Sequence, residues 1–265
     1  MVLAAAAAGV GLFMVLPATA GTLDEVKARG KLICGTQGTS PRYSFEDPLS
    51  RKLVGYEVDL CAGLAKSIGV DVEYKVVSSR NRIPELQQGR VDLLAALITY
   101  SEERNEILAF SNAYFVEPFV IAVRNDSGIT DFSGLTSARI GGVKGSLLEP
   151  VIASKFPDAT QISFDAPDQE YLAFEQGKVV AMAGRKGNLR ELQLKIGEDQ
   201  MTLLPEPLFS AAVGFAFRKD SDDLVAAANA YLAEAGASGD GAKLYETYFG
   251  DLGTEPGFTL GDPIK

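Results

Sequence analysis

The sequence predicts an α/β protein with two lobes, each a mainly parallel sheet flanked by helices. From residue 31 onward, short apolar or alternating runs typical of strands are followed by segments with apolar residues at helical spacing. The run at 91–99, VDLLAALIT, is apolar almost throughout, which is typical of a parallel strand covered on both faces. A second alternating series begins at residue 119, and two such series in 265 residues predict two lobes.

In the first series the expected elements follow one another closely. Residues 31–36 (KLICGT) form a short apolar strand, 58–69 a helix that ends at a glycine, and 71–78 an alternating strand. Residues 83–89 have a proline in the first turn and a glycine at the end, which indicates a short helix. The segment TYSE at 99–102 has the pattern of a capping box and is expected to open the next helix.

The second series begins with a strand at 119–124. Further strands are expected at 138–143, 159–164, 179–184 and 213–218, with helices at 168–177 and within 221–250. We expect residues 21–114 and 214–265 to form lobe 1 and residues 119–209 to form lobe 2. Extended segments near 114–119 and 209–214 then form a two-segment hinge, and the cleft between the lobes is the expected ligand site.

Composition excludes several classes of protein. The formal net charge of −10 opposes binding to nucleic acid. Histidine is absent, which removes the usual general base and most zinc sites, and two cysteines do not make a four-thiolate metal site. We therefore expect no cofactor, no metal site and no nucleic-acid partner.

Residues 1–20 are expected to be a signal peptide. An apolar run reaches Leu16 and is followed by Pro17 and by Ala18-Thr19-Ala20, a pattern that indicates cleavage after Ala20 and export. An uncleaved membrane anchor is the alternative, because the run is almost long enough to span a bilayer.

Export makes Cys34 and Cys61 a candidate disulfide. Disulfides persist in oxidising compartments, and the two cysteines lie on a strand and on the helix expected to pack against it. The alternative is two separate buried thiols, a common role for free cysteine.

Five segments carry a resemblance to a known family. They are TLDEVKARGKLICGT (22–36), LVGYEVDLCAGLAKSIGV (53–70), NRIPELQQGRVDLLAALITYSEER (81–104), FSNAYF (110–115) and KLYETYFG (243–250). In this order and spacing they resemble the bacterial periplasmic solute-binding proteins of family 3, the polar amino-acid type, over nearly all of residues 22–250. The resemblance implies a monomeric periplasmic receptor that closes its two lobes around one small molecule and delivers it to the membrane permease of an ABC importer.

The resemblance also implies a set of ligand contacts. Arg104 matches the arginine that holds the ligand α-carboxylate, and a guanidinium suits this task because it grips a carboxylate bidentately. A solvated arginine paired with Glu103 or Glu106 is the alternative for Arg104. Tyr43 is either a pocket wall or a core aromatic. The other implied contacts are Thr99, main-chain atoms near Leu97, Arg82, Ser79, Gln37, Lys144 and Ser146.

Arg185 departs from the family pattern. The strand at 179–184 ends where family members carry an aspartate that pairs with the ligand ammonium, and the residue here is Arg185. Either the ligand is an organic anion without an ammonium group, or its ammonium is held by another carboxylate such as Asp168 or Glu117, or Arg185 points outward. In the first case Arg185 forms an anion cage with Arg82, Arg104 and Lys144.

A binding protein without catalytic residues is the leading hypothesis for the function. The enzyme alternative arises because some proteins of this fold are dehydratases acting on cyclohexadienyl acids, and these need a general acid in the cleft. Glu117, Glu149 and Glu170 are the candidates for that role. A free-standing sensory receptor for a separate membrane partner is the third class.

Overall fold

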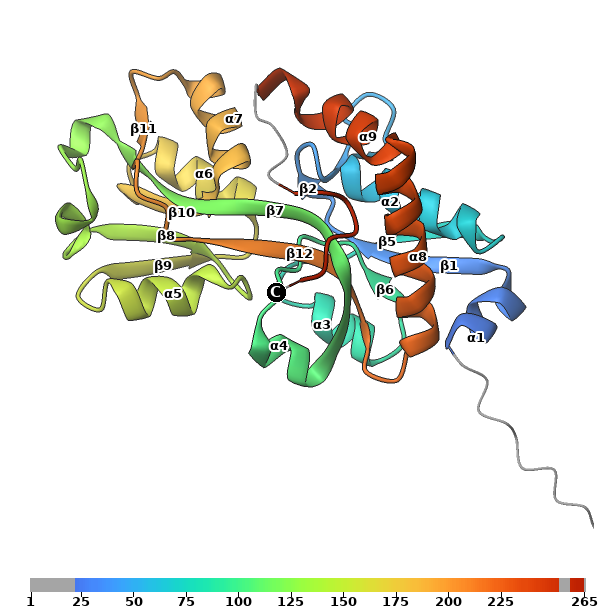
Figure 1. Ribbon diagram of the computed structural model, residues 1–265. Helices are drawn as coiled ribbons and strands as arrows, with labels where there is room; N and C mark the ends of the chain where they lie inside the picture. The colour runs from blue at the N-terminus through green and yellow to red at the C-terminus, as the bar shows by residue number, and fades with distance from the viewer. Residues whose placement is uncertain (1–21, 253–257, 265) are drawn as a thin grey trace, which may run out of the picture.

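Two α/β lobes are joined by two long antiparallel strands (Figure 1). The computed structural model describes residues 22–252 and 258–264. The expected signal peptide lies outside these residues. No helix in the described part of the chain combines the length and the apolar character needed to cross a membrane.

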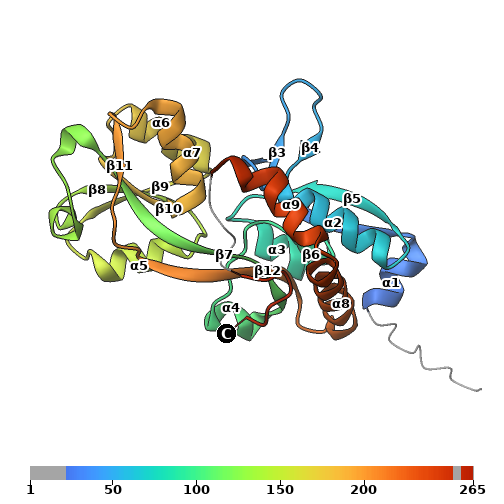
Figure 2. The same cartoon turned by 45° about the horizontal axis from the view of Figure 1, so that its top comes forward.

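The first lobe is built from both ends of the chain. Its N-terminal elements are α1 (Thr22–Arg29), β1 (Lys31–Thr36), β2 (Thr39–Ser40), β3 (Ser44–Glu46), β4 (Leu53–Val54), α2 (Tyr56–Ser67), β5 (Asp71–Val76), α3 (Arg82–Gln87), β6 (Leu93–Leu94) and α4 (Glu102–Ile107). Its C-terminal elements are α8 (Asp222–Ser238), α9 (Asp240–Phe249) and η3 (Gly250–Leu252). Strands β2, β3 and β4 form a separate small sheet, and the β3–β4 hairpin projects from the lobe near α9 (Figure 2).

The second lobe is one continuous stretch of chain. Its elements are η1 (Asn125–Ser127), η2 (Phe132–Leu135), β8 (Arg139–Val143), α5 (Leu148–Lys155), β9 (Thr160–Phe164), α6 (Pro167–Glu175), β10 (Ala181–Arg185), α7 (Lys186–Ile196) and β11 (Met201–Leu203). Helix α5 covers one face of its strands, and α6 and α7 cover the other (Figure 1).

Strands β7 (Leu108–Arg124) and β12 (Phe209–Arg218) run through both lobes. The main sheet has the order β5-β1-β6-β12-β7-β10-β8-β9, and β11 pairs with β7 at its side. Pairing is parallel between β1 and β5, β1 and β6, β8 and β9, and β8 and β10. The β7–β12 pair is antiparallel and its register shifts on either side of Gly214. The predicted α/β fold with mainly parallel sheets is confirmed, whereas the exact lobe bounds stay a prediction.

Each lobe has its own hydrophobic core. In the apolar run at 91–99, residues Leu93, Ala95 and Leu97 pack into one cluster of the first lobe, whereas Leu94, Ala96 and Ile98 pack into another on the opposite face. This alternation explains why the run is apolar throughout, although only Leu93–Leu94 pair as a strand. The second lobe has one cluster on the α5 face and one on the face of α6 and α7.

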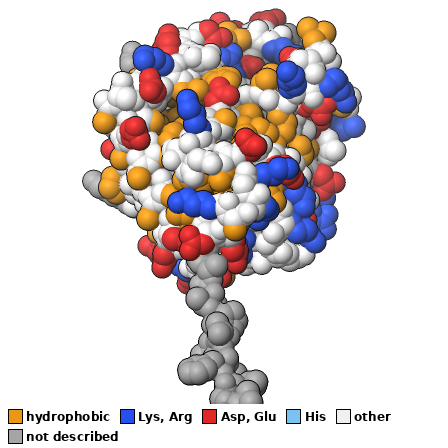
Figure 3. Space-filling model, turned by 90° about the vertical axis from the view of Figure 1, so that its right-hand side faces the viewer, with side chains coloured by type: hydrophobic (Ala, Val, Ile, Leu, Met, Phe, Trp, Pro, Cys, Tyr) orange, Lys and Arg blue, Asp and Glu red, His pale blue; other side chains and the backbone are white. Residues whose placement is uncertain are grey.

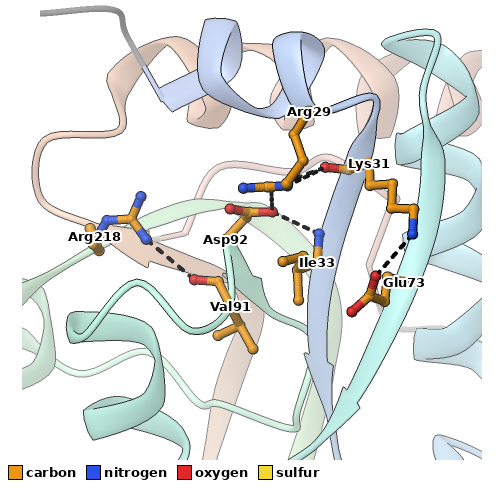
Figure 4. A network of polar contacts seen from close by, with 7 residues as sticks. All are labelled: Arg29, Lys31, Ile33, Glu73, Val91, Asp92 and Arg218. Carbon is orange, nitrogen blue, oxygen red and sulfur yellow. Dashed lines mark hydrogen bonds and ion pairs between the residues drawn. The ribbon is translucent and has the colours of Figure 1, made fainter.

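Polar contacts tie the outer end of the first lobe together (Figure 4). The Asp92 carboxylate accepts a hydrogen bond from the Ile33 amide at 2.7 Å and pairs with the Arg29 guanidinium, which joins α1 and β1 to the turn before β6. Arg218 donates to the Val91 carbonyl oxygen at 3.2 Å. On the surface of this end, acidic and basic side chains are interspersed, with hydrophobic side chains between them (Figure 3).

Two local features bear on the predictions. Cys34 on β1 and Cys61 on α2 form a disulfide, with their Cα atoms 6.5 Å apart. The capping prediction was wrong by two residues, because Ser101 rather than Thr99 is the N-cap of α4 and its hydroxyl accepts from the Arg104 amide.

Candidate functional site

A cavity of about 80 Å³ lies between the lobes, and both lobes contribute to its wall. The first lobe contributes Gln37, Ser40, Ser79, Arg82, Leu97 and Thr99. From β7 and the second lobe come Phe119, Val143, Ser146, Leu147, Leu148, Pro167, Glu170, Tyr171, Ala183, Gly184, Arg185 and Asn188. The cavity is smaller than the roughly 300–1,000 Å³ typical of pockets for drug-sized ligands, so it suits a compact ligand.

Arg185 faces this cavity from the end of β10 and reaches across to the first lobe. Its Nη2 donates to the Leu97 carbonyl oxygen at 2.9 Å and to Thr99 Oγ1 at 3.2 Å. Its guanidinium carbon lies 4.9 Å from the centre of the Phe119 ring, within cation–π distance. The interpretation in which Arg185 points outward therefore does not hold.

Arg82 and Arg104 meet the second lobe at one carbonyl group. Arg82, only 2% exposed, donates from Nη1 to the Ala96 carbonyl oxygen and from Nη2 to that of Gly145 at 3.4 Å. Arg104 donates to the carbonyl oxygens of Thr99 at 2.9 Å and Gly145 at 3.1 Å. Arg104 thus donates to main-chain oxygens, with the charge of Glu103 a smaller influence on its pKa, and it lies beside the cavity rather than in its lining.

The cations of the site disfavour the charges of Arg82 and Arg104. Burial, followed by the nearby charges of Arg104 and Arg185, lowers the pKa of Arg82 to about 9. Burial and then Arg185 lower the pKa of Arg104. A guanidinium stays protonated at neutral pH despite such shifts. The lowered pKa values therefore indicate that the positive charges of the site repel one another, and a bound anion would reduce this repulsion.

Glu57 positions the backbone of Leu97. Leu97 adopts a left-handed conformation with φ 53°, which is unfavourable for a residue with a side chain. Its amide donates to Glu57 Oε1 at 2.6 Å, and the same carboxyl accepts from the Tyr114 hydroxyl. This arrangement directs the Leu97 carbonyl group toward Arg185. The sequence reasoning missed Glu57, although an acidic residue between the buried positions Tyr56 and Val58 of this helix was a signal.

Most of the sequence-predicted contact residues lie in the cavity wall. These are Gln37, Ser79, Arg82, Leu97, Thr99, Ser146 and Arg185. Gln37 Nε2 donates to Ser79 Oγ at 2.7 Å, and the Ser40 hydroxyl donates to Gln37 Oε1 at 2.6 Å. Ser146 Oγ is buried and has no hydrogen-bond partner within the described residues.

Besides Arg104, two predicted contacts lie outside the cavity lining. Tyr43 is fully buried in the core of the first lobe, where its ring packs against Phe115 and Phe249. The core-aromatic alternative therefore describes Tyr43, and the pocket-wall expectation is corrected. The Lys144 ammonium pairs with Asp165 at 2.9 Å outside the cavity lining, so Lys144 does not join the predicted anion cage.

The carboxylates proposed from sequence have different environments. Asp168 is exposed and lies outside the cavity lining. The Glu149 carboxylate accepts from the Ser163 hydroxyl at 2.6 Å and from the Gly145 amide at 3.0 Å. The side chain of Glu117 lies outside what the structure describes.

Glu170 combines burial with a place in the cavity wall. The residue is 3% exposed, and its Oε1 has no hydrogen-bond partner within the described part of the chain. Burial raises its pKa to about 8. The sequence reasoning considered Glu170 only as a general acid, and its place in the cavity wall beside the arginines was missed. The signal was a glutamate on the helix face that also carries Ala173 and Phe174.

Further contacts hold the lobes against each other around the cavity. The Arg42 guanidinium of the first lobe pairs with Glu191 on α7 at 2.9 Å. Gly145 adopts φ +73°, and a Cβ added there would lie 2.7 Å from the Ser79 carbonyl oxygen. Gly145 therefore permits a close approach of the two backbones that a larger residue would obstruct.

Residues 22–252 and 258–264 contain no candidate metal site. Within them, no group of three or more cysteine or carboxylate side chains is placed to hold a metal ion.

Comparison with protein families gives one match across most of the chain. The sequence profile of bacterial extracellular solute-binding proteins, family 3, matches residues 32–251. The glutamine-binding protein GlnH of an ABC transporter in Bacillus subtilis is 26% identical over 231 residues, which are 86% of this chain and 84% of that protein. The L-cystine-binding protein TcyJ of Escherichia coli is 28% identical over 232 residues, 87% of this chain and 86% of that protein.

Solved structures agree with this match. A mutant of ArgBP from T. maritima superposes with a TM-score of 0.80 at 28% identity, covering 86% of this chain and 99% of that one. An ancestral amino acid-binding protein, AncCDT-1, described as a precursor of cyclohexadienyl dehydratase, also gives a TM-score of 0.80, at 27% identity and the same coverage.

Proposed function

Because the chain belongs to family 3 of the bacterial extracellular solute-binding proteins, we propose that it is the substrate-binding component of an ABC importer for an amino acid or a related small carboxylate. The observation that carries the proposal is the convergence of Arg82, Arg104 and Arg185 around a small cavity between the lobes. Guanidinium groups in such a site bind carboxylates by charge-assisted hydrogen bonds. The relatives named for glutamine and L-cystine binding support an amino-acid-sized ligand.

The proposed mechanism is closure of the lobes around the ligand. Residues 21–114 and 214–265 form one rigid unit, residues 119–209 the other, and the segments near 114–119 and 209–214 bend. A ligand that contacts both walls favours the closed form by the difference in its affinity for the two forms. The closed protein, exported with cleavage after Ala20 and acting as a periplasmic monomer, then delivers the ligand to the permease.

Arg185 favours an organic anion without an ammonium group as the second candidate ligand. Its guanidinium already donates to the Leu97 carbonyl oxygen and to Thr99 Oγ1, two acceptors that would suit a ligand ammonium. An ammonium placed there would also be repelled by Arg185 in a largely desolvated site.

A panel of ligands tests the proposal. We expect at least one member of a set of amino acids, dicarboxylates and other small organic acids to raise the thermal unfolding midpoint, since a ligand that binds only the folded state stabilises it. Arg104→Gln should weaken that ligand at least about tenfold by calorimetry, because it removes a cation from the site. The control is Arg190→Gln, a surface arginine that pairs with Glu198 at 2.6 Å. A panel without any stabilising carboxylate, or equal loss in both variants, would refute the proposal.

The lyase alternative rests on Glu170, a buried carboxyl group in the cavity, and on the likeness to AncCDT-1. A neutral carboxylic acid can act as a general acid. Incubation with prephenate and with arogenate distinguishes the classes, since a binding protein leaves both unchanged and a dehydratase consumes one of them.

A further inference from the structure

The Glu170 side chain lies against a glycine of the neighbouring strand, which leaves room for its carboxyl group. The residue lies on α6 with its side chain between the helix and β8. Opposite it on β8 is Gly141, where an added Cβ would lie 3.1 Å from both Cγ and Oε1 of Glu170. The carboxyl group is thus accommodated by a glycine and borders the cavity. A purely structural role would call for hydrogen bonds, yet Oε1 has no partner within the described residues.

Among the described residues, no cation forms an ion pair with the Glu170 carboxyl group, and burial is the cause of its raised pKa. Strands β2 and β9, which pack on α6, carry no charged residue, and the charged residues of β8 and β10 are Arg139 and Arg185. Arg139 is exposed and donates to the carbonyl oxygens of Lys178 and Gly177. Arg185 donates across the cavity to the first lobe.

The other titratable groups of α6 itself are Asp168, Tyr171 and Glu175, and none of them is cationic. Burial is the cause of the raised pKa of Glu170, about 8, so the side chain is a neutral acid at pH 7. A neutral carboxyl group has one O–H to donate.

The remaining walls favour an anion. Arg82 and Arg185 line the same cavity, and each donates to a main-chain carbonyl oxygen of the first lobe. A ligand oxygen is then the partner that both the guanidinium groups and a carboxylic O–H can share.

We propose that Glu170, as a neutral carboxylic acid, donates a hydrogen bond to an oxygen of a bound organic anion that lacks an ammonium group, while Arg82 and Arg185 hold the negative charge of this anion. The inference rests on the proposed function and specifies its ligand class. It makes Glu170 the residue that distinguishes such anions from amino acids of the same carbon skeleton.

The test compares pairs of ligands that differ only in the ammonium group. Succinate and aspartate, and glutarate and glutamate, are titrated calorimetrically into the wild-type protein, Glu170→Gln and Glu175→Gln between pH 7 and pH 9. Glu175 is the matched control because it lies on the same helix and is exposed. Thermal unfolding verifies that each variant is folded.

We expect the dicarboxylates to bind more tightly than their amino-acid counterparts. Affinity in the wild type and in Glu175→Gln should fall about tenfold from pH 7 to pH 9, because only the protonated fraction of Glu170 is competent to donate. Glu170→Gln should lack this loss, since an amide donates at every pH. Any weakening that comes from Arg82 at high pH appears in all three proteins and cancels in the comparison.

Three results would overturn the inference. Amino acids that bind more tightly as pH rises from 7 to 8 would make Glu170 an ammonium counter-ion. Identical pH profiles in the wild type and Glu170→Gln would make it a spectator, with the proposed function intact. Failure of every carboxylate to bind the wild-type protein would refute the proposed function as well.

Discussion

Replacing Glu170 by glutamine should stabilise the protein at neutral pH and have little effect near pH 4. The folded pKa of about 8 lies above the ordinary value of 4.5, so between these values the unfolded chain releases a proton that the folded chain keeps. Between pH 4.5 and pH 8, the contribution of Glu170 to the free energy of unfolding then falls by about 1.4 kcal/mol for each pH unit. Relative to the glutamine variant, the deficit is about 3 kcal/mol at pH 7 and about 4 kcal/mol at pH 8, where the folded carboxyl group is itself half ionised.

Urea unfolding at unit steps between pH 4 and pH 8 measures this difference. For a chain of this size, about 3 kcal/mol also corresponds to a rise of roughly 6–12 °C in Tm at pH 7. Glu175→Gln is the control and should follow the wild type at every pH. Parallel pH profiles for the wild type and Glu170→Gln would show that the Glu170 carboxyl ionises normally and would refute the reasoning.

Three further predictions concern the lobes. Gly145→Ala should weaken ligand binding at least about tenfold, because the new methyl group obstructs closure, and calorimetry that shows unchanged affinity would contradict this. Glu191→Gln should weaken binding roughly two- to fivefold by removing the ion pair with Arg42 across the lobes, and the loss should shrink at high salt. Reducing the disulfide between Cys34 and Cys61, which are 27 residues apart, should lower the free energy of unfolding by about 3–4 kcal/mol, whereas an unchanged urea midpoint in reductant would argue against its contribution.

Much of the fold was predictable because it depends on hydrophobic periodicity. The apolar run at 91–99 indicated a segment covered on both faces, and the structure divides it between two clusters. The sequence did not reveal that only Leu93–Leu94 pair as a strand, because pairing depends on neighbours distant in the chain. Choosing Thr99 over Ser101 as the cap failed for a related reason, since both fit the local pattern.

The site was predictable where a residue matched the family pattern or departed from it. The resemblance implied Arg82 as a contact, Arg185 stood in place of the usual aspartate, and both line the cavity. The left-handed backbone of Leu97 and its support by Glu57 depend on tertiary contacts, so the place of Glu57 in the first turn of α2 did not by itself indicate them. The neutral state of Glu170 likewise arises from burial by elements distant in sequence.

The two crossings of the chain between the lobes have a consequence for the order of folding. The core of the first lobe contains Leu32 and Leu60 from the early part of the chain and Phe215, Phe217 and Leu232 from the late part. The clusters of the second lobe come from a nearly continuous stretch between residues 119 and 211. During synthesis from the N-terminus, the second lobe can complete its core before α8 has been made. The first lobe needs α8 for its core, and forming contacts between such distant parts of a chain is slow. The lobe in which synthesis begins is therefore the lobe that completes its fold last.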